Sequence, residues 1–230
     1  MALLQAQGKP GSASEALRNS VVIERDYSGD ASRHSEMLWT LLSEVLSAPV
    51  AAARRGKPGS NSLHLVDLIA VSIGPGSFTG LRVGLAAAKV FAQFGVIPLV
   101  GVPTLEAAAE DALIRTGKGE VLSALDARRG EVYASRYRRA GKFLRQTGGI
   151  RICTLEEARK GIPADVPLAS ETPSASVIAA LGLARFLAGR SDDPRTLVPV
   201  YVRRPEAVER RMRARLEPGQ ACLKAGKRRR

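Results

Sequence analysis

The chain has few of the residues that most metal sites and disulfide frameworks need. Its 230 residues include only two cysteines and two histidines. Cys153 lies in the body of the chain and Cys222 near its end, so we expect free thiols in a reducing, cytoplasmic setting. His34 and His64 lie in different segments without the spacing of metal ligands. These scarcities argue against a disulfide-stapled domain and against a histidine metal centre.

Long apolar runs and common catalytic patterns are also missing. The longest stretch without a charge, residues 90–105, contains two prolines and is shorter than the roughly 20 apolar residues that a membrane-spanning helix needs. We find no G-x-S-x-G elbow, no H-E-x-x-H helix and no cysteine set near a histidine. A hydrophobic content of 45% still allows one large core or two smaller ones. The sequence therefore predicts no membrane association.

Positive charge is abundant but unevenly placed. The net charge is +13, and residues 203–230 hold eleven Lys or Arg against three Glu. The end of this segment has almost no apolar residues, which predicts a disordered basic tail over 203–230. Such a tail could contact RNA phosphates weakly and without sequence preference, because it lacks an aromatic residue for base stacking. The candidate contact residues are Lys224, Lys227, Arg228, Arg229 and Arg230.

Residues 65–95 form the most informative segment. The apolar run from 66 to 73 predicts a strand that is buried on both faces. Gly74, Pro75 and Gly76 follow and impose a tight turn. Ser77 or Thr79 can cap a helix that runs from about residue 80 to 95. The segment therefore predicts a strand, a glycine turn and a helix in that order.

The glycine turn matches neither of the two common phosphate-binding loops. Its spacing, G-x-G-x-x-x-G from Gly74, is one residue too long for the dinucleotide fingerprint, and no acidic residue follows about twenty positions later. A Walker loop needs Lys and then Ser or Thr after its last glycine. Here Leu81 and Arg82 follow Gly80. The turn is therefore a poor candidate for nucleotide binding.

Two helical segments carry stripes that suggest a partner. In the first, Gly80, Gly84 and Ala88 recur every fourth residue, although glycine costs about 1 kcal/mol in a helix interior. The second, over residues 36–46, has apolar residues at helical spacing. Packing within the chain is the alternative for both stripes; our hypothesis is that one edge of each is buried inside the subunit and the other across an interface. The predicted interface residues are His34, Leu38, Leu41, Leu42, Val45, Phe78, Gly80, Leu81, Gly84, Ala88 and Phe91.

The segment GPGSFTGLRVGLAAAK at residues 74–89 resembles the signature of the TsaB (YeaZ) family of tRNA threonylcarbamoyladenosine biosynthesis proteins, formerly described as peptidase M22-like. Further similar segments lie at residues 33–46, 98–109, 125–137 and 199–207. The resemblance implies an α/β fold of the actin-like, Hsp70-like ATPase class (ASKHA, ribonuclease H-like) with two related halves. We therefore expect one half over 1–101, a second over 102–202, and a helix after Thr104 that joins them.

One departure from the family concerns the first residues. Members of the family open with a strand and a turn that approaches nucleotide phosphate, whereas residues 1–20 show no comparable apolar strand. We therefore expect either that the true start lies upstream of Met1 or that the chain has lost its first strand. No cofactor is expected within the chain, and a nucleotide at a boundary shared with a partner stays open.

The resemblance also implies that the paralogous subunit TsaD is catalytic and that this chain is its partner. In TsaD, the segment that matches residues 101–108 carries two metal-binding histidines, and Thr104 and Ala108 stand in their places here. We therefore expect no catalytic residue and no metal site.

The implied function is that of a non-catalytic scaffold or activator that heterodimerises with a TsaD-like subunit to make N6-threonylcarbamoyladenosine next to the tRNA anticodon. A TsaE-like ATPase is a further candidate partner, and tRNA would be contacted indirectly. Two alternatives stay open. One is a small-molecule kinase or peptidase-like enzyme of the same superfold, and the other is a homodimeric regulatory protein.

Overall fold

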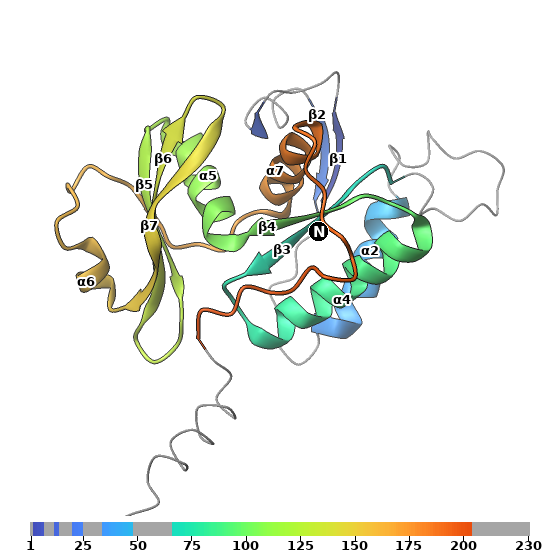
Figure 1. The fold of residues 1–230 in the computed structure, drawn as a ribbon, viewed down its shortest axis with the longest axis horizontal. Coiled ribbons are helices and arrows are strands. Elements are labelled where there is room, and N and C mark those ends of the chain that lie inside the picture. Colours follow the sequence, from blue (N-terminus) through green and yellow to red (C-terminus); the bar gives the residue numbers. More distant parts are fainter. Residues whose placement is uncertain (1, 7–11, 14–19, 25–33, 48–65, 204–230) are drawn as a thin grey trace, which may run out of the picture.

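The computed structural model describes residues 2–6, 12–13, 20–24, 34–47 and 66–203. Three small sheets and the helices around them make up two lobes of an α/β fold (Figure 1). The first lobe holds strands β1 to β4, and the second holds strands β5 to β8. None of the helices within the described ranges is both long enough and apolar enough to cross a membrane.

The first sheet lies at the start of the chain. Strand β1 (Ala2–Ala6) pairs antiparallel with β2 (Ser20–Glu24), with Ala2 opposite Glu24. The expectation that residues 1–20 contain no strand is therefore wrong. A five-residue strand does not need a long apolar run, because a neighbouring strand supplies the partners for its backbone hydrogen bonds.

The second sheet is built by the segment that the sequence marked as a strand, a turn and a helix. Strand β3 (Ile69–Gly74) pairs in parallel with β4 (Leu99–Pro103), and helix α4 (Phe78–Gly95) connects them. Helix α2 (His34–Ser47) packs against α4. The order of elements is confirmed, but β3 is half-buried from Ile69 to Ile73 rather than buried on both faces.

The third sheet has the strand order β7-β6-β5-β8. Strands β5 (Glu120–Asp126) and β6 (Val132–Ala140) form an antiparallel hairpin, followed by β7 (Phe143–Cys153) and the two-residue β8 (Leu168–Ala169). Helix α5 (Thr104–Thr116) packs on one face of this sheet, and the short helix α6 (Leu155–Arg159) packs on the other (Figure 1).

The last helix of the described residues returns to the first lobe. Helix α7 (Ala175–Leu187) packs against β1, β3 and β4. Its approach to β3 depends on Gly182, because a Cβ at that position would overlap the side chain of Ala70. The division of the chain at residue 101 stays a prediction, since β4 runs from 99 to 103.

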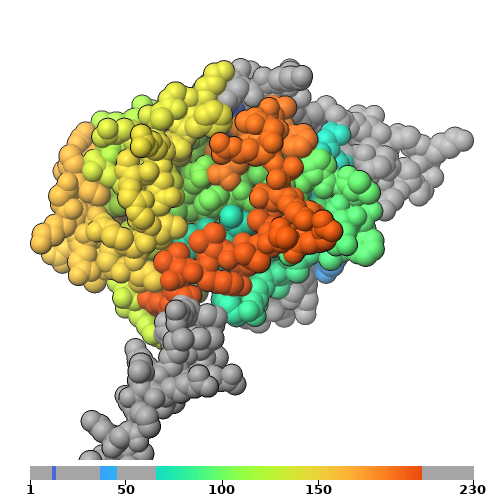
Figure 2. All heavy atoms as spheres, viewed as in Figure 1, coloured from blue at the N-terminus to red at the C-terminus, as the bar shows by residue number. Residues whose placement is uncertain are grey.

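Residues 192–203, which we call the C-terminal strap, link the two lobes. The amide of Val200 donates to the carbonyl of Ile73 in β3 at 2.7 Å. Further along, Arg203 donates to the carbonyl of Ala127 at 3.0 Å, in the turn between β5 and β6. Figure 2 shows this segment in orange, crossing the surface from α4 toward the second lobe. The basic tail beyond it, including Lys224 to Arg230, lies outside the described residues, so its predicted contact with RNA stays a prediction.

Candidate partner interface

Helix α4 is well defined at both ends. Ser77 caps its start, as predicted, because its hydroxyl accepts a hydrogen bond from the amide of Gly80 at 3.3 Å. The helix ends at Gly95, and Val96 follows in the left-handed conformation with a φ of 53°. The N–H of Val96 donates to the carbonyl of Ala92. Between these caps, α4 presents two different apolar faces.

The inner face of α4 packs against the sheet of its own lobe. Leu85, Ala88 and Ala92 are its buried residues. Ala88 and Ala92 form a core cluster with Leu99, and Leu197 of the strap packs against this cluster. Ala88 therefore belongs to the interior of the chain, although the sequence suggested it for a partner.

The outer face of α4 is apolar and partly exposed. It consists of Gly80, Val83, Gly84, Ala87, Val90 and Phe94, which share one side of the helix at 100° per residue. Phe94 is 81% exposed and Val90 is 48% exposed. A Cβ built on Gly84 would meet no atom within 4 Å. Of the predicted small-residue stripe, Gly84 is thus open on its outer side, and nothing in the described part of the chain fills the space above it.

Helix α2 lies beside this face. The rings of Trp39 and Phe91 meet edge to face with centroids 5.7 Å apart, so Phe91 contacts α2. Trp39 is still 57% exposed, whereas Val45 is buried and thus belongs to the interior. The predicted residues Leu38, Leu41 and Leu42 are half-buried. His34 begins α2, but its side chain lies outside the described part of the structure.

Sequence reasoning missed Trp39, Val90 and Phe94. A usable signal existed for two of them, because Val83, Ala87, Val90 and Phe94 repeat at i, i+4, i+7 and i+11, the spacing of a second apolar stripe. The small residues Gly80, Gly84 and Ala88 form a different pattern on the same helix, with a spacing of four residues. Trp39 gave no such signal.

The start of α4 is held by the C-terminal strap. The Arg82 guanidinium lies 3.8 Å from the centre of the Phe78 ring, and its Nε donates to the Tyr201 hydroxyl at 3.2 Å. The rings of Phe78 and Tyr201 are 5.4 Å apart. Leu81 is half-buried and lies against the turn, with its Cδ1 2.9 Å from a Cβ built on Gly74. Phe78 and Leu81 therefore already have partners within the chain.

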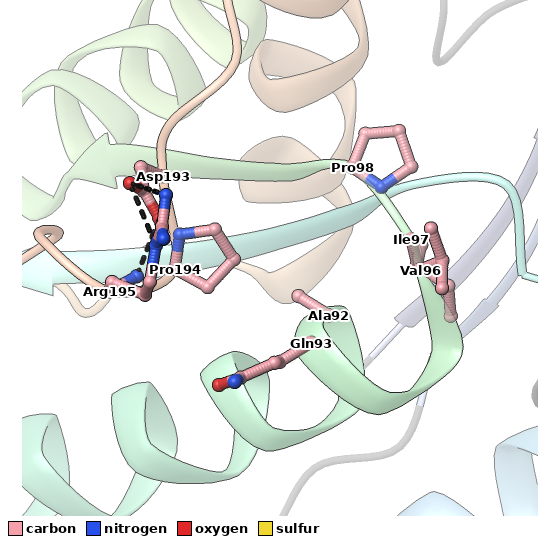
Figure 3. Close-up of a pocket in the computed structure, with 8 residues that line it drawn as sticks. All are labelled: Ala92, Gln93, Val96, Ile97, Pro98, Asp193, Pro194 and Arg195. Carbon is pink, nitrogen blue, oxygen red and sulfur yellow. Dashed lines mark hydrogen bonds and ion pairs between the residues drawn. The ribbon is translucent and has the colours of Figure 1, made fainter.

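A pocket of about 430 Å³ lies at the other end of α4, beside the strap (Figure 3). Its lining is mostly apolar, and its two charged residues, Asp193 and Arg195, bind each other with an N–O distance of 3.1 Å. Hydrogen bonds from Arg195 lower the pKa of Asp193. Because these charges neutralise each other, the pocket wall offers chiefly apolar contact.

The positions that would carry metal ligands in a catalytic paralogue are buried in this chain. The hydroxyls of Thr104, the first residue of α5, and Ser72 of β3 form a hydrogen bond of 2.6 Å, and Ala108 of α5 is buried in the core of the second lobe. Among the described residues, no group of three or more His, Cys, Asp or Glu could hold a metal ion.

The β5–β6 turn contains two carboxylates, and both contact arginine residues. Asp126 accepts a hydrogen bond from the amide of Arg128 at 2.8 Å and also lies 3.8 Å from its guanidinium. Glu131 forms an ion pair with Arg203 of the strap. The turn is therefore a charged, largely exposed connection.

Comparisons with known proteins place the chain in a family. The family model described as TsaD, tRNA N6-adenosine threonylcarbamoyltransferase, matches residues 32–184. The chain is 30% identical over 139 residues to the Escherichia coli protein named tRNA threonylcarbamoyladenosine biosynthesis protein TsaB, a match that covers 60% of this chain and 56% of that protein. It is 32% identical to an uncharacterized protein of Mycobacterium tuberculosis strain H37Rv, covering 81% of this chain and 83% of the relative.

A solved structure supports the same assignment. The crystal structure of an uncharacterized Pseudomonas aeruginosa protein with similarity to peptidase YEAZ superposes with a TM-score of 0.63 at 25% identity. The superposition covers 80% of this chain and 89% of that chain. The predicted fold class is confirmed by this likeness and by the match to the TsaD model. The chain belongs to the TsaB (YeaZ) family of tRNA threonylcarbamoyladenosine biosynthesis proteins.

Proposed function

We propose that this chain is a non-catalytic subunit in the biosynthesis of N6-threonylcarbamoyladenosine in tRNA and that it acts by binding a TsaD-like catalytic subunit. Relatives from Escherichia coli, Haemophilus influenzae and Bacillus subtilis carry this pathway in their names. The matching family model is itself described as the threonylcarbamoyltransferase. The proposed partner would therefore resemble this chain, which favours docking of equivalent helices against each other.

The observation that carries the proposal is the outer face of α4. It combines a glycine with free space above it, Gly84, with two apolar side chains in contact with solvent, Val90 and Phe94. Small residues let the backbone of a second helix approach closely, and the neighbouring apolar side chains then lose their contact with water. Full burial of a Val or Phe side chain contributes about 1.5–3 kcal/mol. Burial of such a face against a partner helix is therefore more favourable than its exposure to water.

The non-catalytic part of the proposal is supported by residue chemistry. A methyl group at Ala108 and a single hydroxyl at Thr104 cannot replace an imidazole pair on a transition metal. The Thr104 hydroxyl is already bound to Ser72. A kinase or peptidase reaction is the weaker candidate, because the carboxylates of Asp126 and Glu131 are each engaged by an arginine.

A homodimeric regulatory protein is the second candidate, because the same outer face could receive a second copy of α4. A TsaE-like ATPase and a nucleotide at the shared boundary remain predictions from the resemblance. The scaffold and the homodimeric regulator differ in one observable property. A scaffold binds the TsaD-like subunit, whereas a homodimeric regulator associates only with itself.

The test is co-elution of the full chain with the TsaD-like subunit of the same cell, measured by size exclusion with light scattering. We expect a stable complex for the natural chain and its loss when charges are placed on the outer face by Val90→Glu together with Phe94→Glu. The control is Val198→Glu, which places the same kind of charge on a 66% exposed residue of the strap and should leave the complex intact.

Four results would count against the proposal. The first is a chain that elutes as a monomer and never accompanies the TsaD-like subunit. The second is a double variant that binds as tightly as the natural chain, which would move the interface away from α4. The third is self-association without binding to the TsaD-like subunit, which would favour the homodimeric regulator. The fourth is turnover by the purified chain alone, which would refute its non-catalytic role.

A further inference from the structure

The sheet of the second lobe has one face that is only partly covered. On its α5 side, Arg139 reaches Glu110 of α5 at 3.1 Å. On the opposite side, α6 covers the part around Ala134, where Ala158 packs. The rest of that side carries Arg136, Arg138 and Arg145, with Lys142 and Phe143 at the turn between β6 and β7. We call these five residues the basic sheet face.

The register of the strands places the arginines together. Arg138 of β6 lies directly opposite Arg145 of β7, and Arg136 lies opposite Thr147. Directly opposite residues of an antiparallel pair point to the same face, as do residues i and i+2 of one strand. All three arginine side chains therefore leave from one surface, and their Cα atoms lie about 5 Å apart across the strands and about 7 Å apart along one strand.

One carboxylate faces these arginines. Glu120 of β5 forms ion pairs with both Arg136 and Arg138. Hydrogen bonds from these arginines, chiefly that of Arg136, lower the pKa of Glu120. The side chains of Arg145 and Lys142 are exposed and have no hydrogen-bond or ion-pair partner among the described residues. The surface therefore holds more positive charge than its own carboxylate neutralises.

This surplus has an energetic consequence. Like charges directly opposite each other in an antiparallel pair are destabilising, and Arg138, with a 64% exposed side chain, faces Arg145. Anionic groups bound between them would convert the repulsion into charge-assisted hydrogen bonds. Because the arginines are spread over two strands, a flexible row of phosphates can meet several of them at once.

We propose that the basic sheet face binds the phosphate backbone of RNA. The choice of RNA rests on the proposed function, in which the substrate of the complex is tRNA, whereas the surface itself is defined by strand register and charge. Phe143, 52% exposed at the edge of the face, offers a ring on which an unpaired base can stack. This site is separate from the basic tail and lies in the described part of the chain.

The test compares two variants of the full chain that each lose two positive charges. Arg138→Gln with Arg145→Gln removes charge from the basic sheet face, and Glu120 keeps Arg136 as its partner. Arg190→Gln with Arg195→Gln removes the same charge from two exposed residues after α7. All proteins keep the basic tail, so any contribution from the tail is the same throughout. The probe is a fluorescently labelled, unmodified tRNA transcript, and its anisotropy is measured at several salt concentrations.

We expect the sheet-face variant to lower the slope of log affinity against log salt by about 1–2, corresponding to one or two lost phosphate contacts. The control should change the slope much less. A third variant, Phe143→Leu, should weaken binding while leaving the slope unchanged, because it removes a stacking ring and no charge. Equal effects of the two charge variants would mean that only net charge matters and would overturn the proposal.

Two further measurements distinguish RNA binding from the recognition of an acidic protein and from the assembly of the complex. Displacement of the tRNA by polyglutamate at equal charge would indicate an acidic protein partner and would also overturn the proposal. Co-elution of each variant with the TsaD-like subunit reports on the proposed function independently. If the sheet-face variant still binds the TsaD-like subunit and its salt slope equals that of the natural chain, only the RNA surface is refuted. If the natural chain does not bind the TsaD-like subunit but the sheet-face variant shows the expected change in salt slope, only the proposed function is refuted.

Discussion

Gly84 is the residue at which stability and partner binding should respond in opposite directions. A Cβ added there meets no atom within 4 Å, so Gly84→Ala introduces no clash in the isolated chain. The substitution removes the cost of a glycine in a helix interior, about 0.8–1.0 kcal/mol. We therefore expect the free energy of unfolding to rise by that amount and the melting temperature to rise by about 2–4 °C for a chain of this size.

A larger side chain at the same position should separate the two effects. Leucine has nearly the helix propensity of alanine, so Gly84→Leu should leave the isolated chain at least as stable as the natural one. In the complex, the leucine side chain would occupy the space that the partner helix needs. We expect binding to the TsaD-like subunit to weaken at least ten-fold, which corresponds to about 1.4 kcal/mol.

Urea denaturation of the isolated chain and calorimetric titration with the TsaD-like subunit measure these quantities. Ala86→Leu is the matched control, because Ala86 is exposed on α4 but lies outside the outer face. It should leave partner binding unchanged. A destabilised Gly84→Ala variant would show that the space above Gly84 is filled. A Gly84→Leu variant that binds the TsaD-like subunit normally would refute a helix contact at Gly84.

Two further predictions concern the scaffold around these surfaces. Gly182→Ala should lower the free energy of unfolding by about 1–2 kcal/mol in a denaturant titration, because overpacking against Ala70 costs about 1–3 kcal/mol and outweighs the gain in helix propensity; an unchanged midpoint would show that α7 and β3 can move apart freely. Glu120 has a pKa lowered in the folded state, so its stabilising effect is present above the unfolded-state pKa of about 4.5 and is lost as pH falls through the folded value. Denaturation at several pH values should show a flatter acid limb for Glu120→Gln, and identical profiles would contradict the role of its arginine partners.

Local signals in the sequence were sufficient for the elements around α4. The strand, the glycine turn, the Ser77 cap and the helix are each specified by residues close together in the chain. The β5–β6 hairpin was predictable for the same reason. Strand β1 was missed, because a five-residue strand is stabilised largely by its pairing with β2 rather than by its own apolar pattern.

The orientation of α4 could not be read from its sequence. Helical periodicity tells which residues share a side but not which side turns inward, and both the side with Ala88 and the side with Phe94 are apolar. The structure decides between them by packing Ala88 against Leu99 and leaving Phe94 exposed. The same ambiguity affected Val45 of α2, which lies on an apolar stripe and is buried within the chain.

The C-terminal strap explains why the two candidate surfaces can be altered separately. The strap packs on the inner side of α4, where the Lys89 ammonium donates to the carbonyl of Leu197 at 3.1 Å, and this leaves the outer face with Phe94 uncovered. The basic sheet face lies on the other lobe toward the β6–β7 turn, whereas Arg203 of the strap reaches the β5–β6 turn at the opposite end of β6. Substitutions at residues that share no partner act nearly additively. A charge placed at Phe94 should therefore impair binding to the TsaD-like subunit without changing RNA binding by Arg138 and Arg145. If the substitution at Phe94 or the substitutions at Arg138 and Arg145 abolished both RNA binding and partner binding, the two lobes would respond as one unit.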